Sequence, residues 1–379
     1  MLWPAIFIGT AAFLLYVVLG YPIVLAGLAR YFPRPVHKAP SHMSVSVIIA
    51  VHNGERFISD KLRSVLALRY PRELMQILVV SDGSTDSTDD LVSEFASAGV
   101  ELIRIPKGGK CSALNEAIPR ARGEILLLTD VRQLVEPESL ERLISCFADP
   151  SVGVVSGEVV IRPGHTHQEA DIRLYWRFET WIRGQLSRID SMLGATGPFY
   201  AMRRSLAVPI PSEILLDDIY LPIAAFFAGY RLVVEPGAHA HDYPTRRDSE
   251  FRRKVRTLAG NYQILLYYPQ LLGFGNRMWF HYLSYKIGRL LLPYGLLLIA
   301  VSGLFLPNPF RWPVIISQGI FYGLAAVDPL ISDTWPLKRL SSPIRTFVAM
   351  MIAALAAVSV FFVPPRSLWK ETKVAVPKI

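Results

Sequence analysis

Cysteine is scarce in this chain of 379 residues, which contains only Cys111 and Cys146. Two cysteines cannot build a disulfide framework, and their separation is not that of paired metal ligands. The sequence therefore excludes a small disulfide-stabilised secreted protein, and it fits a reducing compartment. Internal repeats and low-complexity segments are also absent, so the chain is not a repeat array.

Charged side chains are absent from residues Leu2 to Ala29, which form one long apolar run. A helix needs about 20 residues to cross the roughly 30 Å hydrocarbon core of a bilayer, so this run predicts a transmembrane helix over residues 1–30. A signal peptide is the alternative interpretation. The run has no basic segment before it, however, and no clear small-residue cleavage site after it.

Positive charge follows this run at once, at Arg30, Arg34, His37 and Lys38. Basic residues beside a membrane span mark its cytoplasmic side. We therefore expect an integral protein of the bacterial inner membrane, with its N-terminus outside and the following domain in the cytoplasm.

Apolar residues make up 51% of the chain, and the mean hydropathy is +0.32. These values are too high for an ordinary soluble domain. Three further apolar runs lie near Leu290–Leu306, Pro313–Ile331 and Phe347–Val363. We expect a polar domain at 44–260, followed by a part at 261–379 with an interfacial helix and about three transmembrane segments.

The net charge of +9 raises the question of a nucleic-acid partner. The basic residues are mixed with aromatic residues beside apolar spans, as in 252–256 and 277–289. An anionic membrane surface and a diphosphate ligand explain such a distribution more simply. We expect membrane lipids as partners and no nucleic acid.

The polar domain alternates short apolar runs with segments of helical spacing, such as Ile58, Leu62 and Val65. This alternation predicts an α/β fold with a mainly parallel, doubly wound sheet. The predicted strands are Val45–Val51, Ile77–Val80, Glu101–Ile105 and Ile125–Thr129. Acidic, basic or glycine-rich residues follow each strand, and ligands of open α/β sheets bind at those ends.

The residues at these strand ends resemble the ordered motifs of the family 2 glycosyltransferases. The motifs are Val47 to Glu55, Ser81 to Asp86, Gly109 to Asn115, and Thr129-Asp130. The resemblance covers roughly residues 44–260, and membrane-embedded members such as cellulose, chitin and hyaluronan synthases and ceramide glucosyltransferase are similar beyond it. It implies a glycosyltransferase A fold and a nucleotide-diphosphate-sugar donor, for which we expect UDP.

The resemblance also implies which residues contact this donor. They are Val51, Asn53, Glu55, Asp82, Lys110 and Asp130. Asp82 matches the acidic residue that reads the base, although an acid in this position also suits a turn or a helix cap. Lys107 and Lys110 flank two glycines whose N–H groups are expected to approach the diphosphate.

The family pattern Asp-x-Asp is broken here, because Asp130 is followed at the second position by Arg132. In the family both carboxylates lie near a divalent ion, since a hard cation needs oxygen ligands. Either Asp130 holds Mg²⁺ or Mn²⁺ with the phosphates and a further ligand such as His241, or Arg132 neutralises the diphosphate itself. We expect the metal to be retained.

Two adjacent acids, Asp217 and Asp218, match the paired acidic motif at the start of a helix. The resemblance implies that Asp218 is the general base and Asp217 a supporting acid. The alternative interpretation is that the two acids only cap the helix, where the dipole favours negative charge. The segment from Gly194 to Arg204 resembles the strand before the acceptor site, which makes Gly197 and Arg203 the expected acceptor-binding residues.

The segment Phe251 to Thr257 stands where the membrane synthases carry Gln-x-x-Arg-Trp. Aligned on the arginine, Arg256 keeps the contact to the donor diphosphate, Arg253 takes the position of the glutamine, and Thr257 replaces the tryptophan. Loss of the stacking platform argues against long processive synthesis. An interfacial basic helix is the alternative interpretation of these arginines.

The sequence as a whole predicts inverting transfer of a sugar to a membrane-associated acceptor, either a lipid-linked glycan or a growing polysaccharide. A processive synthase with channel-forming helices is one alternative, and a non-catalytic membrane scaffold with a degenerate transferase domain is another. A nucleotidyltransferase would need a glycine-rich basic loop after the first strand, and His52-Asn53-Gly54-Glu55 is not such a loop.

Overall fold

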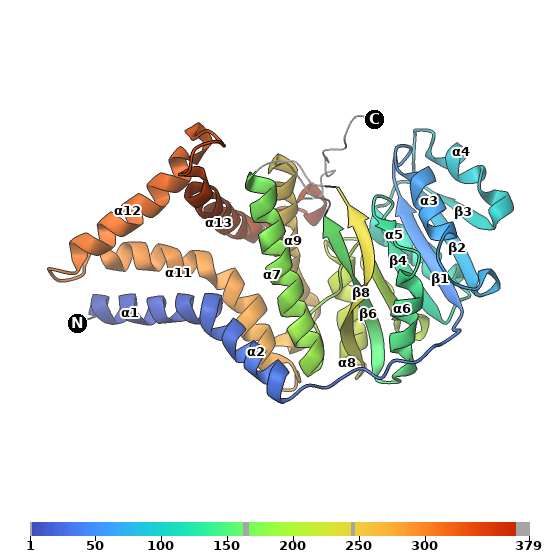
Figure 1. Ribbon diagram of the computed structural model, residues 1–379, viewed down its shortest axis with the longest axis horizontal. Helices are drawn as coiled ribbons and strands as arrows, with labels where there is room; N and C mark the ends of the chain where they lie inside the picture. The colour runs from blue at the N-terminus through green and yellow to red at the C-terminus, as the bar shows by residue number, and fades with distance from the viewer. Residues whose placement is uncertain (1, 162–166, 244–246, 369–379) are drawn as a thin grey trace. The chain divides into compact units, whose positions relative to one another are not determined.

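The computed structural model describes residues 2–161, 167–243 and 247–368 (Figure 1). The chain divides into two compact units. The sheet unit consists of Phe32–Arg162 and Arg183–Tyr243, and the apolar unit consists of Met1–Tyr31, Pro163–Ile182 and Pro244–Ile379. The sheet unit therefore excludes two segments that the expected domain at 44–260 contains.

The sheet unit is built on an eight-stranded sheet, counted over the described residues. Its strands are β1 Val45–Val51, β2 Met75–Asp82, β3 Val100–Ile105, β4 Ile125–Thr129, β5 Leu134–Val135, β6 Val152–Ile161, β7 Phe199–Arg203 and β8 Arg231–Asp242. Their order is β3-β2-β1-β4-β7-β6-β8-β5. The first four strands are parallel, as predicted, while β7 runs antiparallel to both β4 and β6.

Helices of the sheet unit lie between the strands, as the spacing predicted. They are α3 Ile58–Leu66, α4 Thr88–Ser93, α5 Lys110–Arg120, α6 Ser139–Ser145 and α8 Asp217–Phe227. Alternate residues of β1 such as Val47 and Ile49 share one buried cluster with Ile58 and Leu62 of α3. Side chains alternate across a strand with period two, so this face of the sheet is the one that α3 covers.

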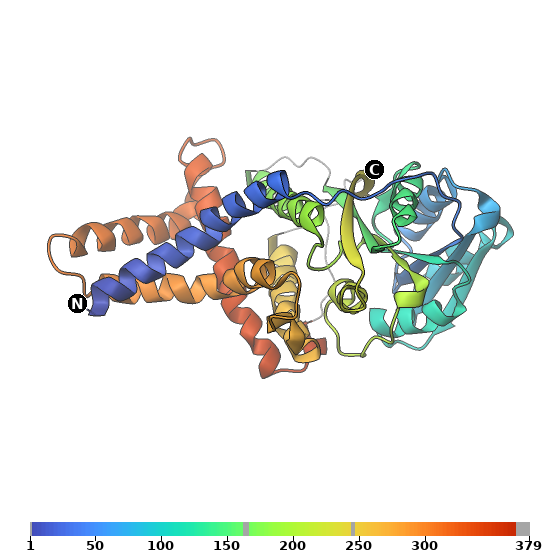
Figure 2. The same cartoon turned by 90° about the horizontal axis from the view of Figure 1, so that it is seen from below.

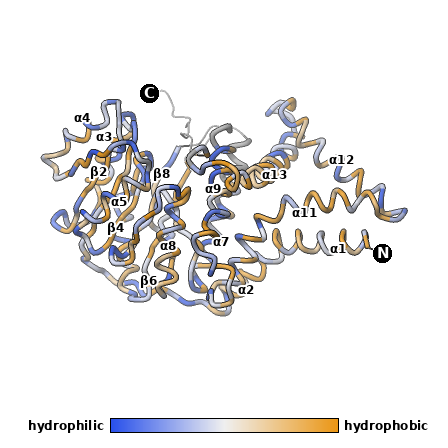
Figure 3. Tube along the Cα trace, turned by 180° about the vertical axis from the view of Figure 1, so that it is seen from behind, coloured by the Kyte–Doolittle hydropathy of each residue, from blue (hydrophilic) through white to orange (hydrophobic). Residues whose placement is uncertain are grey.

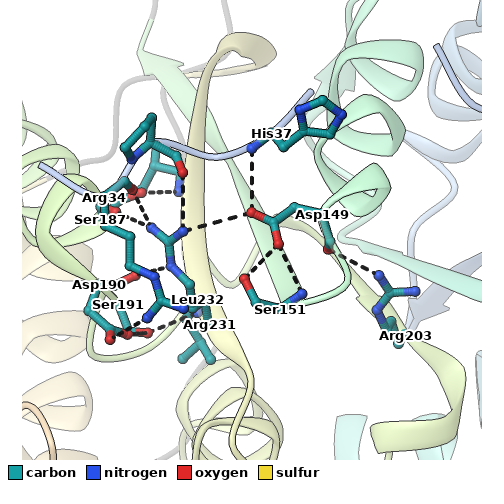
Figure 4. A network of polar contacts seen from close by, with 12 residues as sticks. Arg34, His37, Asp149, Ser151, Ser187, Asp190, Ser191, Arg203, Arg231 and Leu232 are labelled. Carbon is teal, nitrogen blue, oxygen red and sulfur yellow. Dashed lines mark hydrogen bonds and ion pairs between the residues drawn. The ribbon is translucent and has the colours of Figure 1, made fainter. Parts of the chain in front are cut away.

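A buried arginine joins the linker after the first helices to the sheet unit (Figure 4). Arg231 is 2% exposed and donates to the carbonyl oxygens of Arg34 (2.7 Å), Ser187 (3.2 Å) and Asp190 (3.0 Å). Its NH1 atom also lies 3.9 Å from the carboxylate of Asp149. The guanidinium thereby satisfies carbonyl groups at the end of a helix that have no partner within that helix.

The apolar unit consists of helices, several of them long. They are α1 Leu2–Leu15, α2 Tyr21–Tyr31, α7 His167–Ile189, α9 Arg247–Tyr267, α10 Trp279–His281, α11 Gly288–Gly303, α12 Arg311–Val327 and α13 Lys338–Ala356, with π-helical turns at Tyr16–Gly20 and Tyr282–Ile287. The C-terminal part of α7 belongs to the sheet unit. Helix α1 contacts α11, and α12 contacts α13, from which it diverges at an angle (Figure 2).

Four helices in the described residues are long and apolar enough to cross a membrane. They are Leu2–Tyr31, Trp279–Gly303, Arg311–Leu330 and Lys338–Phe361. Hydrophobic residues run along most of their length (Figure 3). The predicted N-terminal span and three C-terminal spans agree with these helices as candidate spans, although all three C-terminal helices begin earlier than the apolar runs indicated.

Polar contacts inside the apolar unit join its helices. Tyr21 Oη lies 3.1 Å from His281 Nδ1. Asp328, which is fully buried, accepts a hydrogen bond from Ser341 (2.7 Å) and pairs with Lys338 and Arg345. A buried carboxylate is tolerated when charged and hydroxyl partners surround it, so this cluster holds the turn between α12 and α13.

Candidate active site

Lys110 connects two acidic segments at the carboxyl ends of the parallel strands. Its ammonium lies 2.9 Å from Asp130, which follows β4, and 3.1 Å from Asp217, the first residue of α8. Burial alone would lower the pKa of Lys110, but the charges of Asp130, Asp217 and Asp218 outweigh it and raise the pKa above its usual value. Lys110 therefore remains protonated at neutral pH.

Asp218 lies directly beside a glycine. A Cβ atom added to Gly197 would be 2.5 Å from Asp218 Oδ2, which is closer than van der Waals contact permits. The backbone N–H of Ala195 donates to the carbonyl of Asp218 at 2.8 Å. The loop before β7 thus fixes the first turn of α8, where the helix dipole favours an ionised carboxylate.

Asp82 accepts hydrogen bonds from two backbone N–H groups, those of Gly108 at 2.6 Å and Gly109 at 2.9 Å. These are the N–H groups that were expected to approach a diphosphate, and the structure gives them a partner within the protein. Gly83 has a φ of +61°, and a Cβ there would be 2.8 Å from Lys107 N. The two expected donor loops are therefore bonded to each other.

The loop after β1 is bonded to the loop after β2 through two of the expected donor residues. Asn53 has a φ of +50°, and its Oδ1 accepts from Thr85 N at 2.8 Å. Glu55 accepts from Ser87 N at 3.2 Å. Val51 is 3% exposed at the end of β1. These contacts give Asn53 and Glu55 a loop-fixing role in the structure, while their contact with a donor stays a prediction.

Arg132 forms a two-point ion pair with Asp242, the last residue of β8. Arg132 Nε lies 2.7 Å from Asp242 Oδ1, and NH2 lies 2.8 Å from Oδ2. Gln133 Nε2 donates to Asp242 Oδ2 at 2.7 Å, and Tyr243 N donates to Oδ1 at 2.7 Å. Asp242 was not among the predicted site residues, although its position directly after the candidate metal ligand His241 was a usable signal.

Lys61 is a second residue that the sequence analysis missed. It is fully buried and donates to Thr129 Oγ1 at 2.7 Å and to the carbonyl of Gln133 at 2.5 Å. Burial lowers the pKa of Lys61 to about 7, and the charge of Asp130 opposes this shift. The signal was present, because Lys61 stands on the same helical stripe as Ile58, Leu62 and Val65.

Tyr200 is a third missed residue. Its side chain is fully buried on β7, and its hydroxyl has no hydrogen-bond partner among the described residues. Burial raises the pKa of Tyr200 well above its usual value, and Asp217, Asp218 and Asp130 raise it further. The tyrosine therefore lies next to the acidic cluster and stays protonated.

Comparison with known proteins identifies the fold that carries this site. Residues 46–208 match the family model described as glycosyl transferase family 2. Residues 46–208 form a family 2 glycosyltransferase domain. Asp130 and Lys110 lie inside the matched segment, whereas Asp217, Asp218 and Asp242 lie beyond it.

Two bacterial relatives are similar to the transferase domain and its surroundings. The probable glycosyltransferase YdaM of Bacillus subtilis is 27% identical over 274 residues, which cover 67% of this chain and 65% of the relative. The poly-β-1,6-N-acetyl-D-glucosamine synthase of Staphylococcus aureus is 25% identical and covers 59% of this chain and 55% of the relative. The chain thus spans less than two thirds of either relative.

A solved structure has a similar fold, and the similarity extends beyond the transferase domain. It is a mannosyltransferase from Pyrobaculum calidifontis, in complex with GDP-mannose and Mn²⁺, with a TM-score of 0.73 and 22% sequence identity. The match covers 95% of this chain and 99% of that one. At this identity the likeness supports the predicted glycosyltransferase A fold alone.

The side chains of this transferase do not fit the expected divalent metal. Asp130, the one carboxylate left from the family pattern, is paired with Lys110, and Arg132 pairs with Asp242. The expected further ligand, His241, lies within β8 and bonds to Glu136 at 2.6 Å. Side chains alternate along a strand, so His241 faces away from the side on which Asp242 meets Arg132. No group of three metal-binding side chains occurs in the described parts of the chain.

Arg203 lies away from the other predicted site residues of the sheet unit, so the structure does not bring it together with them, and its contact with an acceptor stays a prediction. In the antiparallel register Thr129 pairs with Phe199 and Ile125 pairs with Arg203, so Arg203 lies at the opposite edge of the sheet from Asp130. It donates to the carbonyl oxygens of Val152 (2.8 Å) and Phe147 (2.9 Å), and its place near Asp149 is visible in Figure 4. These hydrogen bonds connect the end of β7 to the first residue of β6 and to the segment before β6.

Arg253 and Arg256 lie on α9 in the apolar unit. Arg253 forms a two-point pair with Glu250, and its guanidinium lies 5.1 Å from the ring centre of Trp176. Thr257 Oγ1 bonds back to the carbonyl of Arg253 at 2.9 Å. Contact between these arginines and a donor remains a prediction.

Proposed function

We propose that this chain transfers a sugar from a nucleotide-diphosphate donor to an acceptor hydroxyl at a membrane surface, with inversion at the anomeric carbon. The family 2 domain supports the class of reaction. The observation that carries the proposal is the bridge that Lys110 makes between Asp130, which follows β4, and Asp217, the first residue of α8 and the neighbour of Asp218.

Asp218 is the general base of the proposed reaction. An acceptor hydroxyl is a weak nucleophile at neutral pH, so direct displacement needs a carboxylate that takes its proton as the new bond forms. The first turn of α8 and the glycine at 197 support this role, because a helix N-terminus favours negative charge and the glycine leaves space for the carboxylate. Asp217 supports it by placing the positive charge of Lys110.

Lys110 balances the negative charge that develops on the departing diphosphate. A preorganised ammonium at that position stabilises the transition state more than the ground state, because the charge appears there only as the glycosidic bond breaks. We assign no step to Mg²⁺ or Mn²⁺, since the side chains described above do not form a site for either ion.

The donor in this proposal is a UDP-sugar, read by Asp82, and the acceptor is a lipid-linked glycan or a growing polysaccharide. The four apolar helices support an acceptor at the membrane surface. We further propose that the protein is integral to a bacterial inner membrane, with the transferase domain in the cytoplasm and the N-terminus outside. The cluster from Arg30 to Lys38 supports this orientation.

Synthesis of a polymer is the second candidate, because one relative is named a poly-β-1,6-N-acetyl-D-glucosamine synthase. Thr257 in place of the tryptophan of the membrane synthases favours addition of one or a few sugars instead. Sizing the product of the purified protein separates the two. A long homopolymer would replace the proposal of short addition.

Nucleotide release by the detergent-solubilised protein tests the proposed function. Purified protein is incubated with membrane lipid extract and a panel of UDP-, GDP- and ADP-sugars, and released nucleotide is measured. We expect release with a UDP-sugar, and loss of release in Asp218→Asn. Nucleotide release from no member of the panel, or equal release by Asp218→Asn, would overturn the proposal.

A further inference from the structure

The ion pair between Arg132 and Asp242 occupies the place where the family carries its second metal-binding carboxylate. Arg132 is 19% exposed and Asp242 is 11% exposed in their side chains. Asp242 accepts four hydrogen bonds, two from Arg132 and one each from Gln133 and Tyr243. A carboxylate offers about four such positions, so this acid is saturated by the protein itself.

Lys61 bonds to both ends of the loop that contains Asp130 and Arg132. It is bonded to Thr129 just before Asp130 and to Gln133 just after Arg132. Thr129 Oγ1 in turn donates to the carbonyl of Pro198 at 3.0 Å. The loop from Asp130 to Arg132 is therefore held at both ends by buried partners, and such support is what a preorganised charge requires.

A divalent cation at this loop would meet two positive groups of the chain. It would lie beside the ammonium of Lys110, which is 2.9 Å from Asp130 Oδ1, and near the guanidinium of Arg132, which pairs with Asp242. Like charges at short range inside a protein repel more strongly than in water. The loop therefore carries in its own side chains the positive charge that a metal supplies elsewhere.

We propose that Arg132, oriented by Asp242, acts with Lys110 as the counter-charge of the donor diphosphate, so that donor binding does not require a divalent cation. This inference rests on the proposed function. The ligand class is a nucleoside diphosphate or its sugar, recognised through its phosphate oxygens. An arginine suits this role because its planar N–H groups match phosphate geometry.

The proposed step balances without a metal. The bond between the anomeric carbon and the diphosphate oxygen breaks, and the bond between that carbon and the acceptor oxygen forms. The proton of the acceptor passes to Asp218, and the electron pair leaves with the diphosphate. Lys110 and Arg132 balance the charge that this oxygen acquires. Asp242 and Lys61 are positioning residues, since they act through Arg132 and its loop.

Binding of UDP and GDP to the full-length protein tests the inference apart from turnover. Affinity is measured by calorimetry in detergent, once with EDTA and once with MgCl₂ or MnCl₂. We expect a Kd in EDTA within about threefold of the Kd with metal, a difference of less than 1 kcal/mol by the usual affinity scale. Binding that is lost in EDTA and restored by Mn²⁺ would overturn the inference.

Arg132→Asp gives the sharpest contrast, because it rebuilds the Asp-x-Asp pattern and removes the partner of Asp242. In EDTA we expect the affinity of this variant for UDP to be about 10- to 100-fold lower than that of the wild-type protein, since a charge-assisted contact is lost. We expect Mn²⁺ to restore its binding. If Arg132→Asp binds UDP in EDTA as well as the unchanged protein does, Arg132 is not the counter-charge.

Two further variants separate this role from a structural one. Asp242→Asn is expected to weaken UDP binding in EDTA while leaving the melting temperature of the protein within a few degrees. Arg122→Gln removes an exposed ion pair with Glu101 near the opposite ends of the parallel strands and serves as the matched control. Equal loss of UDP binding in Arg122→Gln and Arg132→Asp would overturn the inference.

The outcomes distinguish the inference from the proposed function. Nucleotide bound without metal, but with no sugar released from any donor, supports the inference and counts against the proposed reaction. Sugar transfer that stops in EDTA supports the proposed reaction and counts against the inference.

Discussion

The carboxylate of Asp218 and the α-carbon of Gly197 lie so close that no side chain fits between them. A Cβ at position 197 would be 2.5 Å from Oδ2 and 3.0 Å from the carboxylate carbon. Gly197 was expected to bind the acceptor. The structure shows a reason for glycine at this position, which is the space that the Asp218 carboxylate occupies.

Gly197→Ala is expected to lower kcat by about 10- to 100-fold, because the new methyl group displaces the Asp218 carboxylate by a fraction of an ångström or more. The Kd for UDP should change little, since the donor-side residues are unaffected. Gly184→Ala on α7 is the matched control, as a Cβ there meets nothing within 4 Å. Unchanged kcat in Gly197→Ala would mean that Asp218 is not the base.

Asp218→Asn is expected to lower turnover by about 10²- to 10⁴-fold, the usual contribution of a positioned base. The Kd for UDP should remain within a few-fold. Asp217→Asn should reduce turnover less, because Lys110 keeps Asp130 as a partner. Steady-state kinetics with the donor found in the nucleotide panel measures both variants. If Asp217→Asn lowers turnover more than Asp218→Asn does, Asp217 is the base and Asp218 the supporting acid.

Lys61→Met is expected to remove a pH dependence of stability. The folded protein loses the Lys61 proton above about pH 7, whereas the unfolded chain keeps it up to its ordinary pKa of 10.5. The unfolded state therefore binds more protons in that window, and the free energy of unfolding rises with pH there. Melting temperatures from pH 6 to pH 10 should show this rise for the unchanged protein relative to Lys61→Met. A difference between the two that does not vary with pH would contradict the lowered pKa.

Arg231→Met is expected to destabilise the protein by about 3 kcal/mol, because it removes the donor to the carbonyl groups of Arg34, Ser187 and Asp190 and the positive charge beside Asp149. Such a loss corresponds to a melting temperature lower by roughly 6–12 °C. Arg34→Gln is the control, since its ion pair with Asp190 is half exposed and worth little. Equal melting temperatures for Arg231→Met and Arg34→Gln would show that the network of Figure 4 does not support the fold.

Cysteine labelling tests the proposed orientation. Cys111 and Cys146 are both buried, so the unchanged protein should give little background with a membrane-impermeant maleimide. A cysteine introduced as Arg63→Cys, at a side chain that is 69% exposed on α3, should be labelled only after the cells are permeabilised. Labelling of Arg63→Cys in intact cells would reverse the proposed topology.

The sequence by itself determined the parallel half of the sheet and the positions of its acidic and basic loops. Runs such as Val45–Val51 are apolar on both faces, which only a covered parallel strand needs, and the helices between them repeat at 3.6 residues. The start of α8 at Asp217 was also predictable, because two adjacent acids suit the first turn of a helix, where the helix dipole favours negative charge. Four apolar helices likewise follow from length and composition.

Only the tertiary structure decided which of these residues meet. The antiparallel register of β4 and β7 moves Arg203 to the far edge of the sheet, and no local pattern encodes that register. The pairing of Arg132 with Asp242 joins residues 110 positions apart. No pattern in a single sequence indicates such a distant contact. Burial of Lys61 depended on the packing of α3 against the sheet. Long-range contacts of this kind arise from how the elements pack, which is why the sequence supplied the groups of the site and the fold supplied their partners.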